Sequence, residues 1–181
     1  MLQAPHAFYD LGTGAIQSAL FDQFPVRAAF FNSAHRYGGP GIAKEDRQKP
    51  TPDLAHRAHS LFQAATIGTA EAMDKPLFVQ IHGFRTRNGE SAVLSSGSAL
   101  QPNHIYQGLQ HQLNLILSDH GPVVSASARP ELAALKNVQG RVLSSTSAFL
   151  HLELSKSTRD DLLENNALLA ELGESLLAVT P

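Results

Sequence analysis

Apolar runs bounded by turn residues divide the chain into predicted strands. Residues Leu77–Ile81 carry four apolar side chains out of five, which is typical of a strand buried on both faces of a parallel sheet. Val26–Asn32 has the same character, and we predict that it is the first central strand. Shorter apolar runs predict further strands at Ala92–Leu94, Pro122–Ser125 and Phe149–Leu154.

Apolar residues spaced three or four apart predict helices between these strands. Residues 1–12 lack this period and are expected to form an irregular lead-in. Helices are predicted over Ile16–Phe24, Thr51–Met73, Pro102–Ser118, Pro130–Leu135 and Ser157–Val179. Because strands alternate with helices, we predict one α/β domain over residues 1–181. Its expected architecture is a three-layer α/β/α fold with a mostly parallel central sheet.

Composition narrows the chemistry that such a fold can carry. The formal net charge is −2 and the basic residues are scattered, which argues against a nucleic-acid partner. No apolar run reaches the roughly 18 residues of a membrane span, and no signal peptide is visible, so a cytoplasmic protein without a membrane partner is expected. The chain has no cysteine but nine histidines, so a metal site must use His, Asp, Glu or water.

Polar residues gather where two predicted strands end. His35 follows Val26–Asn32, and His82 directly follows Leu77–Ile81. Ligands of open α/β sheets bind at the carboxyl ends of strands, so we predict that both histidines bind one Zn²⁺. A third ligand is expected from one of four residues that the sequence does not separate: Asp53, His56, Glu45 or Asp46. The alternatives to metal binding are structural. His82 would cap its strand by a hydrogen bond to nearby backbone, and Asp53 would interact favourably with a helix dipole.

A carboxylate on the last predicted strand is the candidate general base. Glu153 and His151 alternate with leucines, so both project from the same face of the strand. Burying Glu153 requires a partner or a metal nearby, and we predict that it takes a proton from water at the metal. Arg85, three residues after His82, is the second predicted catalytic residue. Predicted substrate-binding residues, with surface ion pairs as the alternative, are Arg36, Arg141 and Arg159.

Three short segments carry a resemblance to a known group. They are Phe-Phe-Asn-Ser-Ala-His-Arg at 30–36, Val-Gln-Ile-His-Gly-Phe at 79–84 and Leu-His-Leu-Glu-Leu-Ser at 150–155. Their order resembles the superfamily of zinc carboxypeptidases, N-formylglutamate amidohydrolases and phage poly-γ-glutamate hydrolases. The resemblance implies a three-layer α/β fold of the phosphorylase/hydrolase-like type and one zinc ion, which is used to hydrolyse amide bonds next to carboxylates.

The resemblance also assigns roles to individual residues. It implies that His35 is the first metal histidine, His82 the second and Glu153 the general base, with a substrate-binding turn at 137–141. The carboxypeptidase pattern has a glutamate three residues after the first histidine, where this chain has Gly38. The segment Asp53-Leu-Ala-His56 is then the expected substitute.

The sequence therefore favours a zinc-dependent hydrolase that cleaves an amide or peptide bond next to a free carboxylate. We expect the polar loop from Tyr37 to Pro50 to border its site. One alternative is a non-catalytic module of the same fold that binds a small anion through its arginines. Another is a phosphatase or esterase, which the absence of a Gly-x-Ser-x-Gly motif disfavours.

Overall fold

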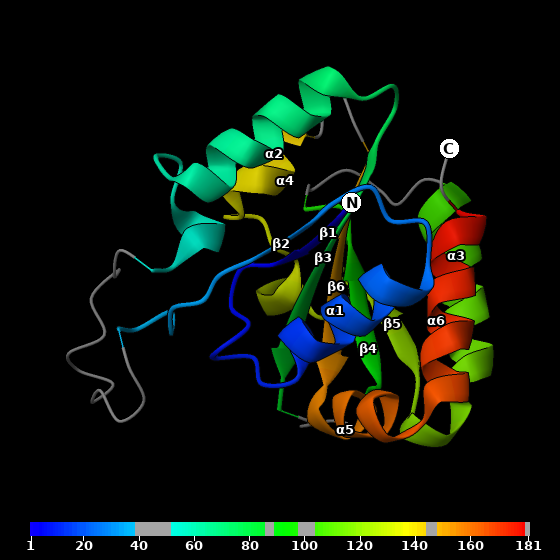
Figure 1. The fold of residues 1–181 in the computed structure, drawn as a ribbon. Helices are drawn as coiled ribbons and strands as arrows, with labels where there is room; N and C mark the ends of the chain where they lie inside the picture. Colours follow the sequence, from blue (N-terminus) through cyan, green and yellow to red (C-terminus); the bar gives the residue numbers. More distant parts are fainter. Residues whose placement is uncertain (39–51, 86–88, 98–103, 144–147, 180–181) are drawn as a thin grey trace.

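A six-stranded sheet forms the centre of the computed structural model, which describes residues 1–38, 52–85, 89–97, 104–143 and 148–179. The strand order is β2-β1-β3-β6-β4-β5, and only the pairing of β4 with β6 is antiparallel (Figure 1). The strands are β1 Leu2–Ala4, β2 Ala29–Phe31, β3 Leu77–Phe84, β4 Ala92–Ser95, β5 Val123–Ser125 and β6 Ala148–Ser155. The predicted mostly parallel α/β architecture is confirmed.

Helices cover both faces of this sheet. On one face α2 packs against α4, and on the other α1 and α3 pack against α6, with α5 beside α1 (Figure 1). The helices are α1 Thr13–Gln23, α2 Leu61–Ala72, α3 His104–Ile116, α4 Val138–Leu143, α5 Lys156–Glu164 and α6 Asn166–Ala178. Short 3-10 helices are η2 Leu54–His56, η3 Ser118–His120 and η4 Pro130–Leu132. Within the described ranges, no helix combines the length and apolar character that crossing a membrane requires.

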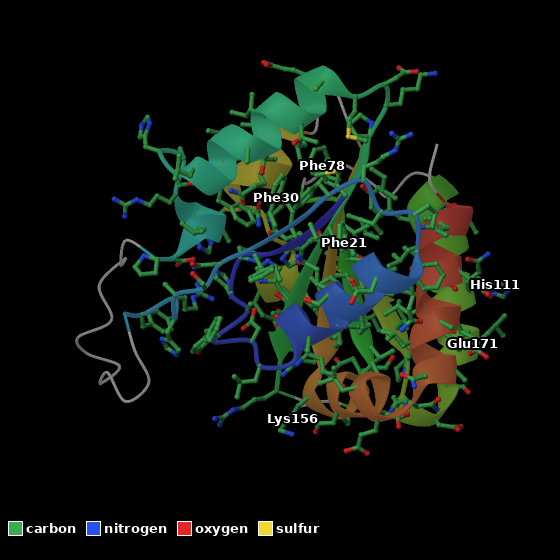
Figure 2. All side chains as sticks on the ribbon, viewed as in Figure 1. Phe21, Phe30, Phe78, His111, Lys156 and Glu171 are labelled. Atoms are coloured by element: carbon green, nitrogen blue, oxygen red, sulfur yellow. The ribbon has the colours of Figure 1, made fainter. Side chains whose placement is uncertain are left out.

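The two faces of the sheet differ in chemistry. Alternate residues of β3 and β6, such as Val79 and Leu152, enter a large apolar core beneath α1, α3 and α6. The opposite face begins apolar, where Phe78 and Phe149 are paired in register and pack with Leu143 of α4. Phe78 accordingly lies inside the molecule, while the side chains of exposed residues such as Lys156 reach outward (Figure 2).

Further along β3 and β6, the α2–α4 face becomes polar. Gln80 lies opposite His151, and His82 lies opposite Glu153. These four side chains are all buried. Because this polar stretch lies toward the carboxyl ends of β3 and β6, it is placed where ligands bind in open α/β sheets.

Two strand predictions are corrected by the structure. The predicted lead-in of residues 1–12 contains β1, which lies inside the sheet between β2 and β3. The predicted central strand Val26–Asn32 is the short edge strand β2, whose Phe31 is 53% exposed. The buried Gln3 interrupts the apolar pattern of β1, which explains why this strand gave no periodic signal.

Two predicted helices are also corrected. The helix predicted from Thr51 is the 3-10 turn η2 followed by α2, which begins only after Ser60, whose side chain accepts a hydrogen bond from the Gln63 amide. The long terminal helix is divided into α5 and α6 at Asn165. The predicted turn at 137–141 largely belongs to the short helix α4.

Candidate metal centre

Seven histidines and carboxylates cluster at the carboxyl ends of the parallel strands β1, β3 and β6. Among the described residues they form three groups, each with its ligand atoms within 4.8 Å of one another. The groups are His6 with Asp53 and His56, His6 with Asp10 and His82, and His82 with His151 and Glu153. Because His6 and His82 each belong to two groups, the three groups form one continuous cluster.

The middle group converges on one carboxylate oxygen. Asp10 Oδ2 lies 3.5 Å from His6 Nδ1 and 3.2 Å from His82 Nδ1. All three residues are buried. Burial alone would raise the pKa of Asp10, but the contacts with the two rings outweigh it and hold this pKa below its ordinary value. The group therefore offers an ionised carboxylate and two imidazole nitrogens to a common space.

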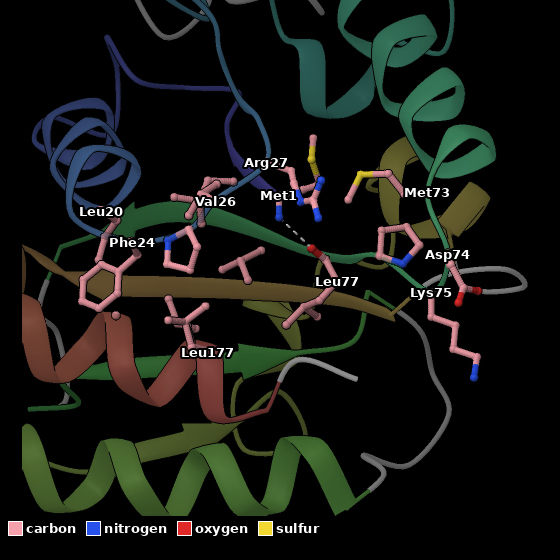
Figure 3. A pocket seen from close by; sticks show the side chains of 16 residues that line it. Met1, Leu20, Phe24, Val26, Arg27, Met73, Asp74, Lys75, Leu77 and Leu177 are labelled. Atoms are coloured by element: carbon pink, nitrogen blue, oxygen red, sulfur yellow. Dashed lines mark hydrogen bonds between the residues drawn. The ribbon is translucent and has the colours of Figure 1, made fainter.

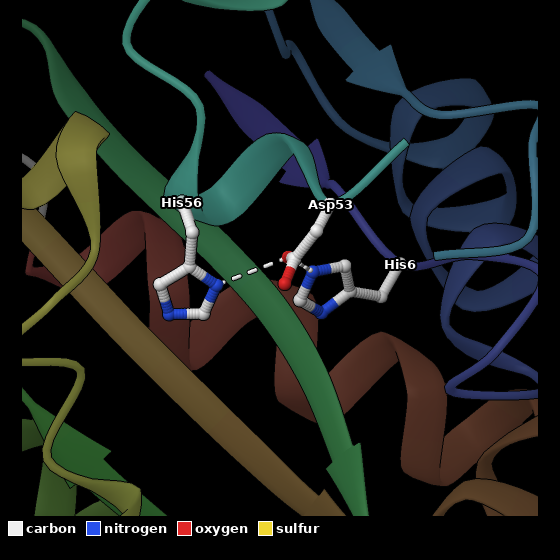
Figure 4. A group of neighbouring side chains, drawn as sticks. All are labelled: His6, Asp53 and His56. Atoms are coloured by element: carbon white, nitrogen blue, oxygen red, sulfur yellow. Dashed lines mark hydrogen bonds and ion pairs between the residues drawn. The ribbon is translucent and has the colours of Figure 1, made fainter. Parts of the chain in front are cut away.

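The His6 ring is held from behind by Asp53. Asp53 Oδ1 lies 2.7 Å from His6 Nε2 and 3.0 Å from His56 Nδ1 (Figure 4). Arg36 Nη2 donates to Asp53 Oδ2 at 2.9 Å. Burial would raise the pKa of Asp53, but the two histidines and the Arg36 charge lower it well below its usual range. Since this carboxylate can only accept, His6 Nε2 carries a proton and donates it to Asp53, while Nδ1 faces Asp10.

Glu153 belongs to the third group, and its pKa is raised, unlike those of Asp10 and Asp53. Burial, followed by the charge of Asp10, raises the pKa of Glu153 to about 8, although Arg159 and Arg36 act in the opposite direction. Burial also lowers the pKa of His82 to about 4. At neutral pH this histidine is therefore uncharged, which is the form that binds metals. The Glu153 carboxyl group is poised to exchange a proton near neutral pH.

His151 contacts both His82 and Glu153. Its ring centroid lies 4.4 Å from that of His82, and its Nε2 lies 3.8 Å from Glu153 Oε1. Burial lowers the pKa of His151 well below its ordinary value. Within the described chain its buried Nδ1 has no hydrogen-bond partner, which is uncommon because buried polar atoms are normally satisfied. The cluster therefore has capacity for a further polar ligand.

His35, the predicted first metal histidine, has other neighbours. It belongs to none of the three groups of described residues, and its ring instead contacts Tyr9 at 5.3 Å and Tyr37 at 6.2 Å between centroids. The reason lies in the strand order. Because β1 and not β2 neighbours β3, the residue beside His82 is His6, which follows β1.

The predicted arginines are dispersed around the molecule. Arg36 borders the cluster and lies over the rings of Tyr9 and Tyr37, at 5.3 and 5.1 Å. Arg85 is exposed just beyond β3, and Arg141 is exposed and donates to the Leu135 carbonyl.

Arg159 is buried and engaged with the backbone. It donates to the carbonyl oxygens of Leu11, Phe84 and Leu154. These carbonyls lie one or two residues from Asp10, His82 and Glu153, so the side chain ties together the segments that carry the cluster. The alternative third ligands Glu45 and Asp46, and most of the loop 37–50, lie outside the described residues.

Sequence reasoning missed His6 and Asp10. Both follow β1 within the segment predicted to be irregular. In the structure His6 follows a strand much as His82 follows Leu77–Ile81, but β1 itself gave no periodic signal in the sequence. Asp10 lies four residues after His6, and the turn between them brings the carboxylate back toward the ring.

A pocket of about 230 Å³ lies at the other end of the strands from the histidine cluster. It is lined at the amino ends of β1 and β3 by residues including Leu2, Leu77 and Val79, and also by Phe24 and Leu177 (Figure 3). This pocket is mainly apolar and includes no member of the histidine cluster. It is therefore separate from the candidate site.

Comparison with known proteins supports the fold. No protein-family model matches the chain, and no curated protein matches it in sequence. Solved structures that match 98% of this chain include the following two. A zinc-free apo form of YndL has a TM-score of 0.57 at 14% identity over 82% of its length. A bacteriophage poly-γ-glutamate hydrolase has a TM-score of 0.54 at 13% identity over 81% of its length.

Proposed function

We propose that this protein is a zinc-dependent amidohydrolase, with His6, Asp10 and His82 as the metal ligands. The observation that carries the proposal is the convergence of two histidine Nδ1 atoms on one oxygen of Asp10. Two imidazoles and a carboxylate are a donor set used by catalytic zinc sites, which keep a further coordination position open. The carboxylate behind His6 is also the usual support of a metal-binding histidine.

The fold comparison adds support at the level of chemistry. One structural neighbour is described as a zinc-free form and another as a poly-γ-glutamate hydrolase. When bound, a divalent ion polarises a carbonyl and acidifies water. The roles of the surrounding residues follow from their own positions.

Glu153 is proposed as the general base and acid. It lies directly opposite His82 in the sheet and is buried beside the proposed ligands, where its carboxylate can accept a proton from water and return it to the leaving nitrogen. His151 Nδ1, a buried nitrogen without a partner among the described residues, is proposed to hydrogen-bond the substrate. Both groups stand on β6 and are thus fixed by the sheet rather than by a loop.

The proposed substrate is an amide or peptide with a free carboxylate next to the scissile bond. Arg36 is the predicted arginine that borders the cluster, and it lies 3.4 Å from His6 Nδ1 through its Nη1. A guanidinium forms paired hydrogen bonds with a carboxylate more readily than any other side chain. We propose that Arg36 orients this carboxylate and keeps its contact with Asp53 through Nη2.

The test is a screen of N-acyl amino acids and short γ-glutamyl and acidic peptides with zinc-loaded protein. Glu153→Gln preserves the side-chain shape and removes its basicity. We expect this variant to retain one equivalent of zinc and to lose turnover by roughly 100-fold or more. Glu171→Gln, on the exposed surface of α6, is the matched control and should turn over like the wild type (Figure 2).

Two results would contradict the proposal. An active wild type matched by an equally active Glu153→Gln variant would remove Glu153 as the base. A zinc-loaded protein that binds these compounds in calorimetry without hydrolysing any of them would favour the non-catalytic anion-binding module.

A further inference from the structure

A chain of buried amides lies directly behind the His82 ring. It consists of Gln3 on β1, Gln80 on β3 and Gln139 on α4, and we call these three residues the amide relay. Each has an exposed fraction of 0%. A primary amide has a donating end and an accepting end, so the orientation of one member constrains the next.

One end of the amide relay is fixed through Thr66 of α2. The Thr66 hydroxyl donates its only proton to the Phe62 carbonyl at 2.8 Å, so it can only accept from Gln3 Nε2, also at 2.8 Å. Gln3 must therefore turn its oxygen toward Gln80. Gln80 Nε2 donates to that oxygen at 2.9 Å.

The other end imposes the same orientation independently. Gln139 Nε2 donates to the Leu54 carbonyl at 3.1 Å and to Gln63 Oε1 at 2.8 Å. Since a carbonyl cannot donate, the amide of Gln139 cannot be reversed, and its oxygen faces Gln80 Nε2 at 3.4 Å. Both ends thus require Gln80 to point its nitrogen into the amide relay.

The oxygen of Gln80 must then point the other way. It accepts from His82 Nε2 at 2.9 Å and from Asn137 Nδ2. Asn137 is itself oriented, because its oxygen accepts from the Gly140 amide at 3.0 Å. Neither the Gln80 oxygen nor the Asp10 carboxylate, 3.2 Å from Nδ1, can donate, so these two acceptors compete for the single proton of a neutral His82 ring. The contact with Gln80 is the shorter one, and its oxygen is held in place by the amide relay, which favours the proton on Nε2.

We propose that Gln80 is a positioning residue that fixes His82 as its Nε2–H tautomer, and that the amide relay transmits this choice from the carbonyls of Phe62 and Leu54. The inference rests on the proposed function in that the freed Nδ1 is the proposed metal-binding atom. Without Gln80, the Asp10 carboxylate 3.2 Å from Nδ1 would attract the ring proton to that atom. The proton would then compete with the metal.

The first measurement is the tautomer of His82 in metal-free protein. Long-range ¹H–¹⁵N correlation spectra distinguish Nε2–H from Nδ1–H imidazole by the two nitrogen shifts. We expect the wild type near pH 7 to show the Nε2–H form at His82. Observation of the Nδ1–H form in the wild type would overturn the inference, whatever the behaviour of the variants.

The second measurement removes the acceptor. In Gln80→Leu we expect the His82 proton to move to Nδ1 and zinc affinity to fall by about 10- to 100-fold, the usual effect of losing such a support. Gln80→Asn, whose shorter side chain withdraws the oxygen from His82 but retains an amide in the core, should show the same shift and guards against misfolding of the first variant. A folded variant of either kind that keeps the Nε2–H form would overturn the inference.

Gln17→Leu is the matched control. Gln17 is a fully buried glutamine of α1 that lies outside the amide relay. Its replacement should leave both the His82 tautomer and the zinc affinity unchanged, and a shift of the tautomer there would contradict the assigned role of Gln80. The tautomer is read without metal. Failure of zinc binding or of hydrolysis with an intact Nε2–H tautomer would therefore count against the proposed function alone.

Discussion

At the scale of single residues, the candidate site depends on side chains that neighbouring strands bury on one face of the sheet. His82 ends an apolar run, and Glu153 alternates with leucines, and the structure places the two opposite each other in register. His6 gave no comparable signal because β1 has only three residues and carries the buried Gln3 at its centre. A buried amide can be recognised as part of the core only once its hydrogen-bond partners are known.

The contrast between His6 and His35 gives a direct prediction. We expect His6→Ala to abolish stoichiometric zinc in elemental analysis, because it removes one of the three proposed ligands and leaves Asp53 without that partner. His35→Ala should retain one equivalent of zinc, since its ring lies against Tyr9 and Tyr37 instead.

The two variants control each other, because both remove an imidazole near the same end of the sheet. Circular dichroism should show that both remain folded. Loss of zinc in His35→Ala with retention in His6→Ala would reverse the assignment and restore the ligand set expected from the sequence.

At the scale of elements, helix existence was predicted better than helix ends. The leucines from Leu162 to Leu177 form a continuous apolar pattern, so the sequence predicted one helix. The structure ends α5 at Asn165, whose side chain accepts from the amides of Ala167 and Leu168 and thereby caps α6. Asparagine is a preferred N-cap residue, and this local signal outweighs the apolar period.

This cap predicts a stability effect. Asn165→Ala should lower the free energy of unfolding by about 1 kcal/mol, because the first amides of α6 lose their acceptor. Asn166→Ala is the control, since Asn166 is the first helical residue of α6 and is also exposed, and alanine has a high helix propensity. Chemical denaturation measures both. Equal effects of the two substitutions would show that the cap does not stabilise the break between α5 and α6.

At the scale of the whole molecule, the sequence predicted the class of fold but not the order of its strands. Alternation of strands and helices is a local pattern, whereas the order β2-β1-β3-β6-β4-β5 depends on pairings between distant segments. The candidate site depends on that order, because it brings the segment after β1 beside β3. The apolar face with its large core provides burial, and the opposite face accommodates the amides, histidines and carboxylates.

The burial of Glu153 on the polar face should make the free energy of unfolding depend on pH. Glu153 is 8% exposed, and in the folded protein its pKa is raised from 4.5 to about 8, chiefly by burial and then by Asp10. Between these two values the folded state binds the Glu153 proton more tightly than the unfolded chain does. Its protonation therefore stabilises the fold fully below about pH 4.5, and this contribution is lost as the pH rises through about 8.

The corresponding prediction concerns metal-free protein and the difference between wild type and Glu153→Gln. Taking the difference separates Glu153 from groups such as His82, whose lowered pKa changes stability in the opposite direction. The glutamine variant cannot ionise, so its free energy of unfolding relative to wild type should increase from about pH 5 to about pH 8. The increase is limited to about 1.4 kcal/mol per pH unit. Urea denaturation across this range measures it. A difference that stays constant with pH would mean that the folded protein does not raise the pKa of Glu153, and Glu153 would then be a carboxylate of ordinary acidity.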